Sequence, residues 1–411
     1  MRGFFSRERF GRPQVLAGLL LVLLPAQCAW LIRSPHYLDA LERSDTSWVV
    51  REGVEQWHGK RIAGTPFRER GLFSPMLPRL HQAEGFDPHH SPLWYLIASS
   101  PYVPWTDTRA DDPVAQRPWL AALSSLALGV LLGGSLWYVA RRLYGNAGGY
   151  IALAFYCFSP GIVINATLWS VESELGAAWG AFGAIFTAIA VAHTLYAPRE
   201  VVLWNWRRIL LLGTSLALAV GSQFSLVILV PIVFTFMLYL APSRRGAAGF
   251  IGAAASVVAF FLLFASYFFH AGVLWQGVQH ASFWPLAAPA FAMSGAYSQT
   301  LSQLGQLSLA AMFALPVALV AYFAWPRARY FGNTAPLLMA ALFIVLGIGT
   351  PHFPGVGFVL VAVPFLFVFI AGVLADMLET RYRSLVMACT AALLAASALW
   401  NLWQIALAGR G

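Results

Sequence analysis

Long apolar runs alternate with short polar connections along most of the chain. Eleven of these runs suit a helix that crosses roughly 30 Å of hydrocarbon, a crossing that takes about 20 mostly apolar residues, and none of them contains Asp, Glu, Lys or Arg. They lie at 14–32, 118–140, 148–166, 175–197, 209–222, 224–241, 248–270, 304–325, 334–349, 355–375 and 384–405. The pattern predicts an all-α polytopic membrane protein with about eleven transmembrane helices and a single membrane domain over residues 1–411.

The Arg residues predict the orientation of these helices. If the basic N-terminus is cytoplasmic, every later cytoplasmic end carries a group of Arg residues: Arg141 and Arg142; Arg199, Arg207 and Arg208; Arg244 and Arg245; Arg327 and Arg329; Arg381 and Arg383. The short outer loops at 167–174, 222–225, 271–303 and 350–354 carry no Lys or Arg. This alternation follows the positive-inside rule only if 209–241 crosses twice, with a break at 222–225. It predicts a cytoplasmic N-terminus, an outer C-terminus and a first run retained as a signal anchor.

One long polar segment, residues 33–117, forms the first outer loop and holds eleven of the seventeen acids. Within it, the spacing of Val50, Val54 and Trp57 predicts an amphipathic surface helix over 45–64, with Arg51, Glu52, Glu55 and Gln56 on the opposite face. Residues 89–101 have an apolar middle too short to span and predict a second interfacial helix. We expect any chemistry of the chain in this segment.

Composition narrows the class of protein further. Apolar residues make up 59% of the 411 residues and charged residues only 10%, which excludes a water-soluble enzyme, since soluble domains carry about 25%. The net charge of +9 belongs to the membrane orientation and predicts no nucleic-acid partner. Three scattered cysteines exclude a disulfide framework and a cysteine zinc site, and nucleotide-binding motifs are missing.

Several local patterns, in this order along the chain, resemble the C-type glycosyltransferase superfamily. The first run is followed by a long outer loop with an acid at Asp45, and His90–Leu96 (HSPLWYL) is similar to the family's His-Pro-Pro-Leu-Tyr-Tyr-Leu run. Ala140–Gly145 (ARRLYG) and the Phe158-Ser159-Pro160 break resemble a basic turn and a Ser-Pro break of these enzymes. His352-Phe353-Pro354 looks like the family's Arg-Tyr…Pro signature.

The resemblance implies a polytopic enzyme that takes a sugar from a polyprenyl-phosphate carrier on the outer face. Asp45 then is the general base that takes the proton from the acceptor hydroxyl during inverting transfer; its alternative role is to cap the surface helix. Asp39 and Glu42 are the alternative acids. Glu172 and Glu174, where many members place another acid, are candidates for orienting the acceptor or holding a divalent cation.

The lipid phosphate of such a donor calls for cations on the outer side. The available side chains are Arg51, Arg68, Arg70, His89, His90, His280 and His352. With Asp87, the adjacent His89 and His90 also form a weak candidate metal site, although adjacent histidines on a loop are more often unspecific. No cofactor other than this possible divalent cation is predicted.

The expected partners are a polyprenyl-phosphate sugar donor, membrane lipids and a glycan, lipid or protein acceptor. The strong preference for Arg over Lys indicates a GC-rich genome and favours a bacterial inner membrane. Three departures from the family pattern keep other functions open: a lone Asp45 where an acidic pair is frequent, Gln223 where Lys is common, and His352-Phe353 in place of Arg-Tyr. The alternatives are a lipid-linked sugar flippase or transporter and a non-catalytic subunit of a polysaccharide assembly complex.

Overall fold

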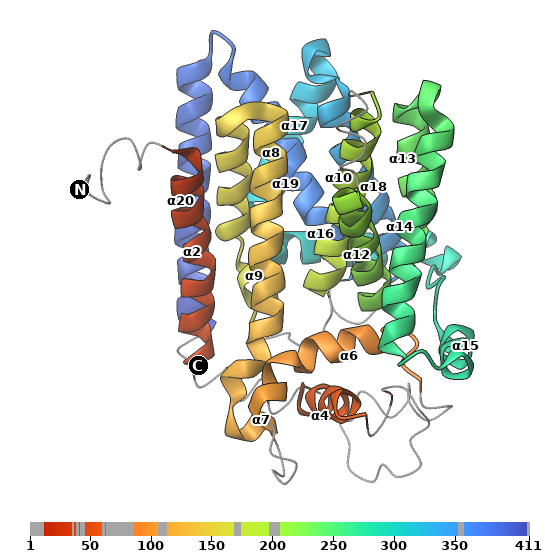
Figure 1. The fold of residues 1–411 in the computed structure, drawn as a ribbon. Coiled ribbons are helices and arrows are strands. Elements are labelled where there is room, and N and C mark those ends of the chain that lie inside the picture. Colours follow the sequence, from red (N-terminus) through yellow and green to blue (C-terminus); the bar gives the residue numbers. More distant parts are fainter. Residues whose placement is uncertain are drawn as a thin grey trace, which may run out of the picture. The chain divides into compact units, whose positions relative to one another are not determined.

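The computed structural model describes residues 12–34, 37, 41, 46–59, 62, 86–105, 113–167, 174–196, 206–351 and 357–408. Every regular element in these ranges is a helix, which confirms the predicted all-α class (Figure 1). The chain divides into two compact units. The first consists of Met1–Leu38, Leu126–Trp169 and Leu286–Gly411, and the second of Asp39–Ser125 and Ser170–Pro285.

The first unit contains most of α8 together with the N-terminal and C-terminal helices. Its elements are α2 (Pro13–Ile32), α8 (Leu123–Cys157), α9 (Pro160–Asn165), η5 (Ala288–Ala292), α16 (Ser294–Leu307), α17 (Leu309–Ala324), η6 (Pro326–Ala328), α18 (Phe331–Ile348), α19 (Phe358–Leu378) and α20 (Arg383–Ala408). The hydroxyl of Tyr156 donates to the carbonyl of Gly129, 2.6 Å away, so α8 folds back on itself as a hairpin. The reversal falls at Gly145, whose φ of 74° lies in the region that favours glycine.

Helix α19 forms the core of the first unit. It packs against α16, α17, α18 and α20, and its most apolar stretch, which is long enough to span a membrane, is completely buried inside the protein. Phe367 stacks on Phe155 of α8. Because no part of this stretch is exposed, its apolar side chains pack against other parts of the protein.

Polar side chains of α2 and α20 bind the backbone where the second leg of α8 ends. The predicted Ser-Pro break is confirmed, because α8 ends at Cys157 and α9 begins at Pro160. Gln27 of α2 donates to the carbonyl of Cys157 at 3.1 Å, and Ser397 of α20 donates to the carbonyl of Phe158 at 3.0 Å. Gln27 also accepts a hydrogen bond from Asn401. Since Gln27 and Asn401 both lie near the C-terminal ends of their helices, α2 and α20 run in the same direction.

The second unit contains most of the described part of the first outer loop and five further α-helices. Its elements are α4 (Thr46–Trp57), α6 (Pro92–Ser99), η1 (Ser100–Trp105), α7 (Pro113–Gln116), η2 (Pro118–Ala122), α10 (Glu174–Thr194), α12 (Trp206–Ser222), η3 (Phe224–Ile228), α13 (Leu229–Leu240), η4 (Pro242–Arg244), α14 (Arg245–Ser266) and α15 (Ala271–His280). Helices α10 and α12 approach closely at Gly180, where an added Cβ would lie 2.5 Å from the backbone nitrogen of Ala219.

The helix predicted within residues 45–64 is confirmed as α4, but its predicted polar face is partly wrong. Its place on the membrane surface stays a prediction. Glu52 and Gln56 are buried, whereas Trp57 is exposed. The side-chain amide of Gln56 donates to the carbonyl of Ser266 at 2.7 Å. This carbonyl belongs to the last turn of α14, where backbone oxygens lack a partner within the helix. Gln56 is therefore buried because its side chain supplies a hydrogen-bond donor to the end of α14, and this contact outweighs the polarity pattern of α4.

Seven helices in the described part of the chain are long and apolar enough to cross a membrane, or eight if α16 and α17, which meet at 111°, form one broken span. The difference from eleven predicted segments has two reasons. The stretch Pro118–Cys157 counts as one helix although it covers one predicted segment and half of a second, and α12, α13 and α17 are shorter than a full span. The predicted break in 209–241 is confirmed, because α12 ends at Ser222 and η3 begins at Phe224.

Candidate functional site

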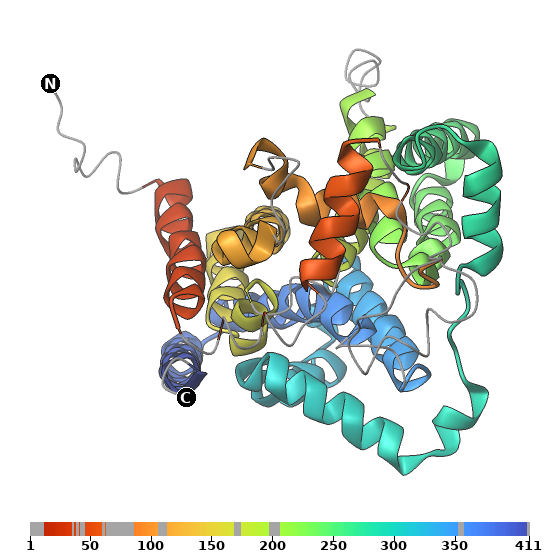
Figure 2. The same ribbon diagram turned by 90° about the horizontal axis from the view of Figure 1, so that it is seen from below.

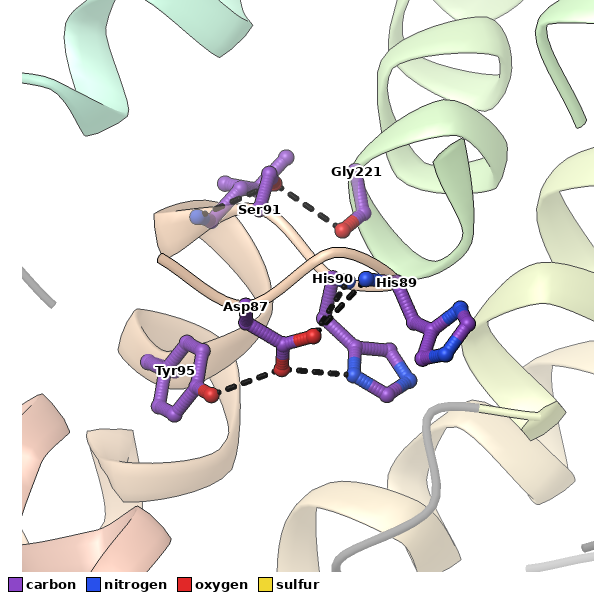
Figure 3. Close-up of polar contacts among 7 residues, drawn as sticks. Asp87, His89, His90, Ser91, Tyr95 and Gly221 are labelled. Atoms are coloured by element: carbon purple, nitrogen blue, oxygen red, sulfur yellow. Dashed lines mark hydrogen bonds and ion pairs between the residues drawn. The ribbon is translucent and has the colours of Figure 1, made fainter. Parts of the chain in front are cut away.

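A carboxylate saturated with hydrogen bonds lies in the extended segment just before α6 (Figure 3). One oxygen of Asp87 accepts the backbone N–H groups of His89 and His90, at 2.8 and 3.2 Å. The other oxygen accepts the Nδ1 of His90 at 2.9 Å and the hydroxyl of Tyr95 at 2.8 Å. The first pair is the turn that Asp side chains commonly make with the backbone two and three residues ahead. The second pair fixes a histidine ring and links the segment to α6.

The electrostatics of this cluster follow from its burial and its donors. Burial alone raises the pKa of the Asp87 carboxyl, but the charge of protonated His90 and the hydrogen bonds from His90, His89 and Tyr95 outweigh burial and hold that pKa well below its usual range. Burial lowers the pKa of the His89 imidazole, and the negative charge of Asp87 offsets part of that effect. Asp87 is therefore a weak base without a spare acceptor position, and its role is to position His90.

Two other parts of the second unit hold this segment by its backbone. Both the N–H and the Oγ of Ser91 donate to the carbonyl of Gly221 at the end of α12, each at 2.9 Å, and Phe224 N–H donates to the carbonyl of His89 at 2.9 Å. After α15, the N–H of Ser282 donates to the carbonyl of Pro88 at 2.7 Å. Ser91 also caps α6 by accepting from the N–H of Leu93, a favoured arrangement that Pro92 at the first helical position reinforces.

A third predicted histidine lies beside the same segment. The ring of His280, the last residue of α15, stacks on Phe86 with centroids 5.4 Å apart, and its Nδ1 lies 2.7 Å from the carbonyl of Gln276. The rings of His89 and His90 are 6.2 Å apart. The second unit thus assembles three of the predicted phosphate ligands around residues 86–91.

The other predicted site residues have different outcomes. Arg51 is exposed on α4 and lies 3.6 Å from Glu55 on the next turn. Glu174 is buried at the start of α10. The remaining predicted residues lie outside the described part of the chain: Asp39, Glu42, Asp45, Arg68, Arg70, Glu172 and His352. Their roles stay predictions, including the role of Asp45 as general base.

The candidate metal site at Asp87, His89 and His90 does not form as predicted. Both oxygens of Asp87 accept hydrogen bonds, and one of them accepts from the Nδ1 of His90. Within the described ranges no group of three or more His, Cys, Asp or Glu residues suits a metal ion. The possible divalent cation at Glu172 and Glu174 stays a prediction.

The positioning role of Asp87 and Tyr95 is not predicted from the sequence. The sequence pattern offers Asp87 only as a weak metal candidate with His89 and His90, and Tyr95 only as part of the run that resembles the family. The available signal was Asp87 two residues before a histidine pair and a Ser-Pro helix start, a context in which Asp caps a turn. The contact with Tyr95 needs the turn at residues 88–91, which periodicity does not reveal.

The apolar helices and their order define a polytopic membrane protein with the C-type glycosyltransferase fold. The solved structures that share it include the apo form of ArnT from Cupriavidus metallidurans, with a TM-score of 0.58 and 14% identity over 90% of this chain and 61% of ArnT. They also include the oligosaccharyltransferase AglB from Archaeoglobus fulgidus in complex with an inhibitory peptide and a dolichol-phosphate. Its TM-score is 0.57, with 13% identity over 95% of this chain and 56% of AglB.

The chain therefore spans about three fifths of the length of ArnT and little more than half of AglB. The apo form of the A. fulgidus oligosaccharyltransferase has a TM-score of 0.53. No protein-family model and no curated protein matches the sequence. At these identities the likeness establishes the fold.

Proposed function

We propose that this protein is an integral-membrane glycosyltransferase that takes a sugar from a polyprenyl-phosphate donor and passes it to an acceptor on the outer face. The observation that carries the proposal is the fold, shared over at least nine tenths of the chain with ArnT and with an oligosaccharyltransferase solved with a dolichol-phosphate. The histidine cluster at residues 86–91 supplies a polar site in the outer segment of that fold.

In the proposed reaction, the acceptor hydroxyl oxygen attacks the anomeric carbon of the donor sugar. A new glycosidic C–O bond forms while the bond between that carbon and the lipid phosphate breaks, so the configuration inverts. The lipid phosphate leaves as an anion, and a carboxylate takes the hydroxyl proton. We assign this base to Asp45, which directly precedes α4 in the sequence.

We assign His90 to the departing phosphate. Its Nδ1 is held by Asp87, so its Nε2 is the ring nitrogen left to donate to an anion, as in other carboxylate-oriented histidines. His89 and His280 lie in the same cluster and are the second candidates. A hydrogen bond between charged groups contributes about 1.5–3 kcal/mol, which corresponds to roughly 10- to 100-fold in affinity.

The direct test is sugar transfer by the purified full-length chain from a panel of lipid-linked sugars in detergent or nanodiscs. We expect Asp45→Asn to abolish transfer and Glu55→Gln, on the exposed side of α4, to leave it unchanged. Wild-type rates for Asp45→Asn, Asp39→Asn and Glu42→Gln together would contradict the assigned base. A lipid-linked sugar that is moved across a bilayer without being consumed would instead favour a flippase.

The phosphate ligand needs a separate experiment. Binding of a short-chain polyprenyl phosphate should weaken 10- to 100-fold in His90→Gln. It should stay unchanged in His58→Gln, whose exposed ring has its Nδ1 2.8 Å from the carbonyl of Val54 in the same helix. Equal affinity of the wild type and His90→Gln would remove His90 from the proposed site.

We also propose that the N-terminus is cytoplasmic, the C-terminus lies outside, and the membrane is a bacterial inner membrane. The parallel direction of α2 and α20 supports an odd number of crossings, since it puts the start of α2 and the end of α20 at opposite ends of the first unit. The Arg residues at the predicted cytoplasmic ends support the sign of this orientation.

A further inference from the structure

Residues 246–326 contain no Asp, Glu, Lys or Arg. This uncharged stretch includes all of α14 after its first residue, Arg245, the loop after α14 and α15, all in the second unit. A surface that faces water is commonly about 25–35% charged. An outer loop without any charge therefore calls for a surrounding other than bulk water.

Exposed aromatic side chains continue from α14 into this loop. On α14, a stripe of large apolar side chains is exposed, at the helical spacing of one face: Phe250, Val257, Phe260 and Phe261. The ring of Phe269, 52% exposed, packs against Phe261 and Phe264 with centroids 5.4 and 5.3 Å apart. The face that a spanning helix turns to lipid thus extends past the end of that helix.

The backbone at this point is strained to keep two aromatic residues. Phe268 and Phe269 have φ values of 48° and 60°, in the left-handed region where a glycine would fit without cost. The N–H groups of both residues are bound by carbonyls in the last turn of α14. The sequence therefore places bulky aromatic side chains at two positions whose backbone conformation favours glycine.

Helix α15 then lies across the direction of α14 (Figures 1 and 2). Its inner side packs on the turn, since an added Cβ at Gly277 would lie 2.7 Å from the hydroxyl of Tyr267. Its outer side exposes Trp275 to 63%, and the following segment exposes Trp284 to 69%. Tryptophan is enriched where a membrane meets water, and a transverse helix with such side chains lies in that interface.

We infer that α15, with Phe268, Phe269 and Trp284, is a lipid-docking element inserted at the boundary between headgroups and acyl chains of the outer leaflet. Because the element carries no charge, it binds this boundary through its aromatic rings and does not depend on anionic lipids. It also touches the histidine cluster, through the stacking of His280 on Phe86 and the bond from Ser282 to Pro88. This contact connects the lipid surface to residues 86–91; only its use for a lipid-phosphate donor rests on the proposed function.

The test measures the depth of spin labels in the full-length chain in nanodiscs. In a Cys389→Ser background, in which the two remaining cysteines are buried, labels are attached at Trp275→Cys and, separately, Gln276→Cys and Trp284→Cys. Val257→Cys on the exposed face of α14 gives the lipid reference, and Arg142→Cys, an exposed position in the turn of α8, gives the water reference. Collisions with oxygen report lipid and collisions with a soluble nickel chelate report water.

We expect the Trp275 and Trp284 labels to collide more with oxygen than with the nickel chelate and to lie at a depth between the two references. The depth should be the same in neutral and in partly anionic nanodiscs. Nickel accessibility equal to that at Arg142 for the labels at 275, 276 and 284 would overturn the inference. So would a water-exposed label that a soluble oligosaccharide immobilises, since this surface would then bind glycan. The measurement uses no substrate, so failure of the glycosyltransferase assignment leaves its result interpretable.

Discussion

Replacing Asp87 with Asn tests whether this carboxylate organises the outer site. The substitution keeps the shape of the side chain and one oxygen that can accept the N–H groups of His89 and His90. It places an amide N–H₂ where the second oxygen accepts from His90 and Tyr95. Tyr95 can turn its hydroxyl to accept, but His90 must give up its Nδ1 proton to do so. The variant therefore loses the carboxylate that accepts from the Nδ1 of His90 and places a donor opposite that nitrogen.

The size of the effect follows from the two contacts that change. Hydrogen bonds to charged groups contribute about 1.5–3 kcal/mol each. Because Asn recovers part of the contact with Tyr95, we expect the free energy of unfolding to fall by about 3 kcal/mol. For a unit of about 200 residues this lowers Tm by roughly 6–12 °C. Tyr95→Phe, which removes the hydroxyl that donates to the Asp87 carboxylate, should cost about 1.5–3 kcal/mol.

The assay is thermal unfolding of the purified chain in one detergent over a range of pH. The pKa of Asp87 is lower in the folded chain than in the unfolded chain, so its contribution to stability is complete above the unfolded pKa of about 3.9 and disappears as the pH falls through the folded pKa. The difference in Tm between wild type and Asp87→Asn should thus persist from pH 7 to about pH 4 and shrink below. A Tm of Asp87→Asn within about 1 °C of wild type at pH 7 would refute the reasoning.

Three further substitutions test other contacts. Burial lowers the pKa of His89 in the folded chain, so as the pH falls below about 6.5 this histidine is protonated first in the unfolded chain. The Tm of the wild type should therefore drop between pH 7 and 5 by more than the Tm of His89→Gln. Parallel curves of Tm against pH would contradict this. Gly180→Ala forces α10 and α12 apart and should lower the free energy of unfolding by about 1–3 kcal/mol. The control is Gly249→Ala, whose added methyl group meets nothing within 4 Å. Equal decreases in Tm for the two variants would refute the packing argument. Asn401→Leu removes the hydrogen bond to Gln27 and should lower the stability against unfolding in detergent by about 0.6–1.7 kcal/mol. An unchanged unfolding midpoint would show that this hydrogen bond contributes no net stability.

The elements could be predicted from the sequence because membrane helices are constrained by solvent. Apolar runs of spanning length, with Arg at alternate ends, locate the helices, and each of the eleven predicted segments contains a helix where the structure describes it. The break after Ser222 could be found only by combining this length with the charge pattern. The face of α4 could not be predicted, because Gln56 is buried by a carbonyl of Ser266 that is 210 residues distant.

For the candidate site, residue chemistry could be predicted but geometry could not. The preference of phosphate for cations selected His89, His90 and His280 together, and the second unit places them around one segment. The contact between Asp87 and Tyr95 could not be predicted, because an extended turn, held by the backbone of distant elements, brings the two residues together. Helical and strand periods carry no signal for such a turn.

The completely buried helix α19 has the highest mean hydropathy of the spanning helices, although protein encloses it. In a membrane, helix insertion comes before helix association, and the two steps select for different properties. The apolarity of α19 serves the first step, when the segment must partition into lipid alone. Once its neighbours α16, α17, α18 and α20 have assembled, shape is what matters. Large-to-small changes along α19 should therefore spare insertion into the bilayer and still prevent assembly of the first unit.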